Sequence, residues 1–140
     1  MTPNFTLAEL TITNHRTLDN TPDPASRANL QRLAVFLELV KDRLGGRAVM
    51  VTSAYRSAAV NAACGSRETS QHRLGCAADV RVPGMTPDAV VRAVMASGLA
   101  YDQLIREFDA WTHLSIPSTP TAAPRKSALI IDRAGTRPFA

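Results

Sequence analysis

The stretch SQHRLGCAADV, residues 70–80, places His72 and Asp79 on either side of Gly75. The small and β-branched residues of CAADVRV, 76–82, are followed by a Pro-Gly pair and predict a buried strand. Glycine lets a chain reverse at positive φ, so Gly75 allows the preceding loop to bring ligands seven residues apart together. We therefore expect a turn and a strand that unite an imidazole and a carboxylate.

Outward from this stretch, the pattern alternates between helices and short strands. Thr6 and Glu9 have capping-box spacing, which predicts a short N-terminal helical turn. Ser26 is expected to cap the strongest helix, in which apolar residues recur at i, i+3, i+4 and i+7 until Gly45-Gly46. Further helices are predicted at 57–64 and 86–98. Strands are predicted at 47–53, 76–82, 101–108 and 111–116, and a last one at 127–132.

Two or three helices and about five strands, partly segregated along the chain, predict an α+β fold. We expect a small, mostly antiparallel sheet with helices packed on one face. The length of 140 residues suits a single domain. Within it we expect an N-terminal arm and short helix (1–25), a core (26–132) and a C-terminal tail (133–140).

Composition narrows the function classes. Hydrophobic residues make up 45% and charged residues 20%, which is typical of a globular protein. The net charge is +4, but the basic residues are scattered, so we expect no nucleic-acid partner. No run approaches the ~18 apolar residues of a membrane span. The N-terminus lacks a basic segment followed by an apolar block, so we expect no signal peptide. We also expect no membrane insertion and a monomer.

The cysteines and histidines are few. We expect Cys64 and Cys76 to be buried free thiols, while a disulfide or zinc ligation stays open. His113 lies in WTHLS, where alternation places Trp111, His113 and Ser115 on one face of a strand. Two imidazoles and a carboxylate can form a catalytic zinc site, which leaves a fourth position on the ion. Spacing alone also allows two structural histidines, and no HExxH motif is present.

A resemblance favours the metal site. Residues 70–80 match the pattern S-x-H-x-x-G-x-A-x-D, which resembles the M15 metallopeptidases, zinc D-Ala-D-Ala peptidases that share a fold with the Hedgehog signalling domain. FTLAEL, the helix near 26–44, VTSAYRS and YDQLIREFDAWTHLS resemble further segments of this family, in the same order. The resemblance covers about residues 5–131. It implies the Hedgehog/DD-peptidase fold.

The same resemblance implies the residues of the site. The ligands of one Zn²⁺ would be His72, Asp79 and His113. Many members carry an acid three residues before the last histidine, where this chain has Ala110. Glu107 is therefore expected to be the catalytic base, provided that a hairpin turn returns the chain, and Asp109 is the reserve.

The resemblance also implies substrate contacts. Arg56 is expected to bind substrate through a carboxylate, which a guanidinium can hold with two parallel hydrogen bonds, although the chain has Ala54 where the family usually has glycine. Further residues expected to contact the substrate are Ser70, Gln71 and Trp111, with packing beside the metal left open as the alternative for Trp111. Asp102 and Gln103 are expected to brace a ligand histidine.

The implied function is hydrolysis of peptidoglycan stem peptides, at a D-alanyl bond. Alternatives are an L-alanyl-D-glutamate endopeptidase of the endolysin type and a non-catalytic zinc module of the cell wall or a phage structure. The protein is expected to be made in the cytoplasm and to act on the cell wall, as a phage or prophage enzyme would.

Overall fold

The computed structural model describes residues 1–139 and contains one mixed sheet with helices packed against it. The sheet has six strands in the order β1-β2-β4-β3-β5-β6, and every neighbouring pair is antiparallel except the parallel pair β3–β5. The strands are β1 (Met50–Ser53), β2 (Ala77–Arg81), β3 (Gln103–Glu107), β4 (Trp111–Ser115), β5 (Ser127–Asp132) and β6 (Gly135–Pro138). The helices are α1 (Leu7–Leu10), α2 (Pro24–Arg43), α3 (Ala58–Ala63), the 3₁₀ helix η1 (Gln71–Leu74) and α4 (Pro87–Ser97). The predicted α+β fold with a mostly antiparallel sheet is confirmed.

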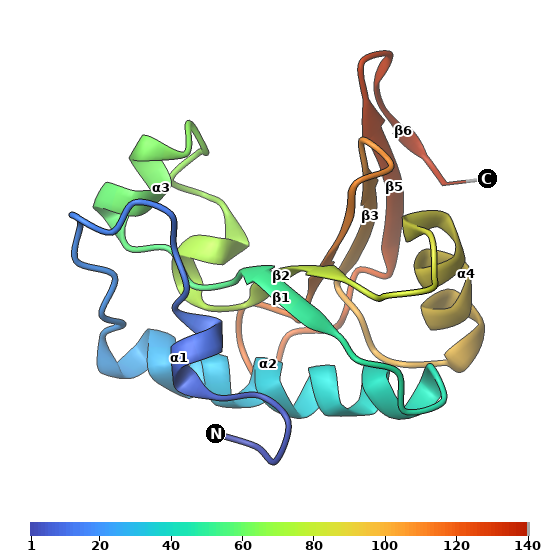
Figure 1. Ribbon diagram of the computed structural model, residues 1–140, viewed down its shortest axis with the longest axis horizontal. Coiled ribbons are helices and arrows are strands. Elements are labelled where there is room, and N and C mark those ends of the chain that lie inside the picture. The colour runs from blue at the N-terminus through green and yellow to red at the C-terminus, as the bar shows by residue number, and fades with distance from the viewer. Residues whose placement is uncertain (140) are drawn as a thin grey trace.

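The long helix α2 runs beneath the sheet (Figure 1) and supplies much of the core. Its buried residues follow the predicted helical spacing: Leu30, Leu33, Ala34, Leu37 and Val40. They form one cluster with buried side chains of the sheet, among them Val80, Leu104 and Leu114. Since each fully buried leucine contributes about 1.5–3 kcal/mol through the hydrophobic effect, this helix anchors the sheet.

Two helix starts test the capping predictions. The capping box of Thr6 and Glu9 is present, with Thr6 Oγ1 accepting from Glu9 N at 3.1 Å. The predicted cap at Ser26 is wrong, because Asp23 caps α2 and its Oδ1 accepts from Ser26 N at 2.7 Å. Pro24 then occupies the first helical position, where its missing N–H costs no hydrogen bond.

The C-terminal end departs from the prediction. Residues 127–132 are not the last strand, because β6 pairs with β5 in the segment expected to be a tail. The hairpin extends away from the rest of the sheet (Figure 1). All four residues of β6 are exposed, so the strand has no apolar alternation by which it could have been recognised.

Among residues 1–139, no helix combines the length and apolar character that crossing a bilayer requires.

Gly75 fixes how η1 sits on α2. It adopts φ +78°, and a Cβ there would lie 2.7 Å from Ser26 O and 3.1 Å from Leu30 Cγ. We expect Gly75→Ala to lower the free energy of unfolding by about 2–4 kcal/mol, through left-handed strain and overpacking together. Urea unfolding measures this loss.

Gly98→Ala is the matched control for this substitution. Gly98 has φ +77°, but a Cβ added to it would meet no other atom within 4 Å, so the substitution should cost only the strain of about 1 kcal/mol. Equal losses for the two variants would show that the close approach of η1 to α2 contributes nothing.

Candidate metal centre

His72 is held by its backbone and its ring. The hydroxyl of Ser70 caps η1 and accepts from His72 N at 3.3 Å, and Gly75 ends the turn in the left-handed conformation. The ring Nδ1 lies 2.7 Å from the carbonyl oxygen of Ala54, which can only accept a hydrogen bond. The proton is therefore on Nδ1, and Nε2 is left free on the side facing Asp79.

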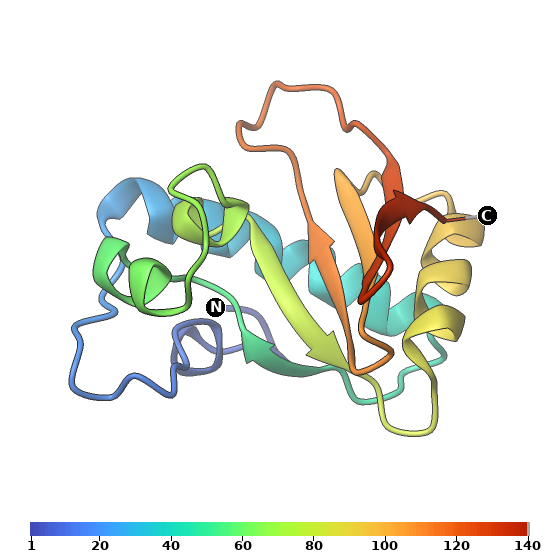
Figure 2. The ribbon, with the colours of Figure 1, turned by 90° about the horizontal axis from the view of Figure 1, so that it is seen from above.

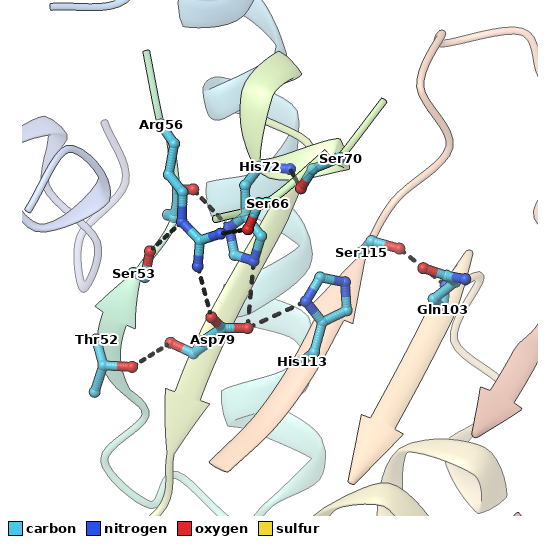
Figure 3. Close-up of polar contacts among 11 residues, drawn as sticks. Thr52, Ser53, Arg56, Ser66, Ser70, His72, Asp79, Gln103, His113 and Ser115 are labelled. Atoms are coloured by element: carbon cyan, nitrogen blue, oxygen red, sulfur yellow. Dashed lines mark hydrogen bonds and ion pairs between the residues drawn. The ribbon is translucent and has the colours of Figure 1, made fainter. Parts of the chain in front are cut away.

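Asp79 and His113 lie directly opposite each other on the neighbouring strands β2 and β4, which run side by side in Figure 2. Directly paired residues share one face of a sheet. Asp79 Oδ1 lies 3.1 Å from His113 Nδ1 and 3.3 Å from His72 Nε2. Figure 3 shows both imidazoles converging on this one carboxylate.

These three side chains fit a single metal ion. One potential ligand atom from each lies within 4.8 Å of those of the others, and all three residues are buried. With Nδ1 protonated, the lone pair of His72 Nε2 faces a carboxylate oxygen, and two acceptors repel unless a cation lies between them. Two nitrogens and one oxygen are donors that zinc accepts. The predicted clustering of His72, Asp79 and His113 is confirmed.

Asp79 stays ionised in this setting. Burial alone would raise the pKa of its carboxyl group, but the adjacent imidazoles of His72 and His113 lower that pKa well below its usual value. The residue can therefore offer a negatively charged oxygen to a cation throughout the neutral pH range.

Arg56 holds the far oxygen of the same carboxylate. Its Nη2 donates to Asp79 Oδ2 at 3.3 Å, its Nε to Ser53 Oγ at 3.1 Å and its Nη1 to Ser66 Oγ at 2.9 Å. All three guanidinium nitrogens are thus engaged within the protein (Figure 3). Arg56 fixes Asp79 so that Oδ1 remains turned toward the histidines.

We expect Arg56→Ala to weaken zinc binding about 10- to 100-fold, because removing a residue that orients a metal ligand typically has this effect. Competition with a chromophoric chelator measures the affinity. Arg67→Ala is the matched control, since Arg67 is an exposed arginine of the same loop region with no ion pair among the described residues. Unchanged affinity in the Arg56 variant would contradict the orienting role.

Glu107 reaches the site through a hairpin. It pairs with Trp111 across β3 and β4, and the turn between them places Phe108 and Asp109 at positive φ. This is the return of the chain that the prediction for Glu107 required. Burial raises the pKa of its half-buried carboxyl group, and the nearby charge of Asp79 raises it further. Asp109 instead is exposed and pairs with Arg106 at 3.3 Å.

A cavity of about 340 Å³ is lined by His72, Asp79 and His113. It is also lined by Arg56, Ser70, Glu107 and Trp111, which the sequence predicted for the site, by Cys64, and by Ser66, which the sequence did not single out. Ser66 lies in an irregular loop with no motif that could have identified it. The expectation of a buried thiol holds for Cys76 but is wrong for Cys64, which is exposed at this cavity.

Gln71 and Asp102 are placed elsewhere. Gln71 does not line the cavity, because its amide donates to Asp102 Oδ2 and to the carbonyl of Ile116, both at 3.0 Å. Asp102 also binds Arg125, which lowers the pKa that burial would raise. These contacts tie η1 to the long β4–β5 connection that arches outward in Figure 2.

The expected bracing of a histidine by Asp102 or Gln103 is wrong. Within residues 1–139, neither side chain forms a hydrogen bond with His72 or His113, and Gln103 uses its backbone N–H to bind Ser115 Oγ. The carbonyl of Ala54 takes this role for His72. A backbone carbonyl has no residue type that marks it, so this partner of His72 could not be predicted from the sequence.

A second cavity, of about 510 Å³, adjoins the first. Its lining comes from the start of β1, residues 80–87 at the end of β2 and in the following loop, Val90 of α4, and residues 109–112 of the β3–β4 hairpin. Trp111 lines both cavities. The indole Nε1 of Trp111 is buried and has no hydrogen-bond acceptor among the described residues. Because Trp111 belongs to the lining of both cavities, it marks the boundary between them.

Comparison with protein families adds one result. A family model described as Peptidase M15 matches residues 3–115, which include His72, Asp79, His113 and Glu107. No curated protein matches the sequence.

Proposed function

The chain belongs to the peptidase M15 family of metallopeptidases, and from that premise we propose that it is a zinc-dependent peptidase of peptidoglycan stem peptides. The observation that carries this proposal is the buried group of His72, Asp79 and His113 with Glu107 in the same cavity. A hydrolase of this type needs a metal-binding group, a proton carrier and an open space beside them. All three requirements are met by one cavity.

Each residue has a role in the proposed mechanism. His72 Nε2, His113 Nδ1 and Asp79 Oδ1 would hold the ion. When bound, zinc polarises a carbonyl group and lowers the pKa of water. The Glu107 carboxylate takes a proton from the attacking water and gives it to the leaving amine, a role for which a raised pKa is suited. Arg56, besides orienting Asp79, keeps two N–H groups that can contact the peptide.

The substrate bond is the finer part of the proposal. We place it in the stem peptide, at a D-alanyl bond, and the protein would then act at the cell wall. Ser70 and Trp111 line the cavity and are proposed to contact the peptide. For Gln71 we propose an indirect role, because its amide is occupied by Asp102 and Ile116.

Digestion of purified muropeptides tests this function. The zinc-loaded protein should convert defined muropeptides to shorter products whose masses identify the bond cut. A chelator should stop the reaction, and added zinc should restore it. Products shortened by D-alanine support the proposed bond, and a new N-terminal D-glutamate would move the cut to the L-alanyl bond. If the zinc-loaded protein left every muropeptide intact, the peptidase proposal would fail.

A further inference from the structure

The second cavity lies at the ends of β1, β2 and β4 and takes its lining from both faces of the sheet. Val80, Val82 and Thr112 belong to the face that α4 covers, with Val90 of α4 beside them, whereas Met50, Arg81 and Trp111 belong to the face of Asp79 and His113. Arg81 follows Asp79 by two residues on β2, and Trp111 precedes His113 by two on β4, so each pair shares a face. Met50 is paired with Arg81 and Glu107 with Trp111. A row of four side chains therefore crosses the sheet about 7 Å beyond Asp79 and His113.

Arg81 brings a positive charge to the second cavity. It is exposed, it lines the second cavity, and its side chain forms no hydrogen bond or ion pair within residues 1–139. Asp109 lines the same cavity, but its carboxylate is paired with Arg106. Beside Arg81 the wall is apolar, with Met50, Val82 and Met85. Such a hollow suits an aliphatic chain that ends in, or lies beside, a carboxylate.

Arg56 is less suited to capturing a carboxylate. Each of its three nitrogens already donates to Ser53, Ser66 or Asp79. A carboxylate bound in parallel by two N–H groups requires a free edge of the guanidinium. Arg56 is also the only arginine or lysine that lines the metal cavity in the described part of the chain.

We propose that the second cavity is a substrate subsite in which Arg81 binds a free carboxylate of the peptide, while the scissile bond lies at the metal-binding residues beyond Trp111. The proposal rests on the peptidase function proposed above and deepens it. Residues of an extended peptide advance by about 3.3–3.6 Å each. The offset of Arg81, about 7 Å, therefore corresponds to a carboxylate about two residues from the bond that is cut.

Peptide binding tests the subsite directly. The probes are the synthetic stem peptide L-Ala-γ-D-Glu-L-Lys-D-Ala-D-Ala and two forms in which either the D-glutamyl α-carboxylate or the C-terminal carboxylate is an amide. Calorimetry on the zinc-loaded Glu107→Gln protein gives the affinities of uncleaved peptides. We expect one of the amides to bind about 3- to 10-fold more weakly than the free peptide, as loss of an exposed charge-assisted contact predicts.

Arg81→Gln should abolish this discrimination, and Arg81→Lys should restore part of it, because lysine keeps the charge. Arg27→Gln is the matched control: Arg27 is exposed on α2, forms no ion pair among the described residues, and should change nothing. Arg56→Gln should leave the discrimination intact even if it weakens overall binding. The proposal is overturned if neither amide binds more weakly, if Arg81→Gln still discriminates, or if discrimination follows Arg56.

The two proposals fail in different ways. Hydrolysis of the peptides by the wild-type protein, with a KM that is indifferent to Arg81, would overturn the subsite and leave the peptidase function standing. Arg81-dependent binding without hydrolysis by the wild-type protein would overturn the peptidase function and leave the carboxylate site standing. Absence of binding by any peptide would overturn the subsite.

Discussion

His113→Ala is expected to remove zinc from the isolated protein and to lower kcat/KM by at least about 10³-fold, or about 4 kcal/mol of transition-state stabilisation. Within residues 1–139, His113 supplies one of the three ligand atoms that converge, and it lies opposite Asp79 in the register of β2 and β4. Loss of the imidazole leaves two ligands, too few for a stable zinc site of this type. Metal analysis and peptide hydrolysis measure the two effects.

His15→Ala is the matched control for this variant. His15 lies in the N-terminal arm and lines neither cavity, so its loss should change neither zinc content nor hydrolysis. Circular dichroism and urea unfolding establish that both variants are folded. A His113 variant that kept one zinc per chain and near wild-type hydrolysis would refute the assignment of the metal site.

The second large effect is expected for Glu107→Gln, which should lower kcat by about 10²- to 10⁴-fold, the usual contribution of a general base. Glutamine keeps the shape of the side chain but cannot accept the proton of the attacking water. Since Glu107 is not one of the three clustered ligands, zinc content should stay at the wild-type level. Parallel measurement of kcat, KM and bound zinc separates these quantities.

Asp109→Asn provides the comparison for Glu107. Asp109 was the reserve base, but its carboxylate is exposed, pairs with Arg106 and does not line the metal cavity. Its replacement should alter kcat less than about 3-fold, as expected for a surface substitution. Strong loss with Asp109→Asn and little loss with Glu107→Gln would reverse the assignment of the two acids.

Much of the site could be predicted because its residues stand in local patterns. The spacing of His72, Gly75 and Asp79 implied a turn before a strand, and the alternation in WTHLS placed His113 and Trp111 on one face. Glu107 could be predicted as a site residue only if a hairpin was assumed. On a straight strand, six residues would separate it from His113 by about 20 Å.

The remaining features left no pattern to recognise. Ser66 accepts a hydrogen bond from Arg56 and lies in an irregular loop. Gln71 points away from the metal cavity because its amide donates to the buried carboxylate of Asp102. The strand β6 is stabilised by pairing with β5 rather than by burial. In each case the decisive partner lies far away in the sequence, where composition and periodicity give no information.

The contact between His72 and Ala54 has a consequence for natural variation. The acceptor belongs to the peptide unit, so exchanging alanine for glycine leaves the tautomer of His72 unaltered. Position 54 has no exposed surface, however, and a bulkier side chain would displace the carbonyl itself. Substitution at position 54 is therefore limited by the size of the new side chain, although no atom of that side chain takes part in the chemistry.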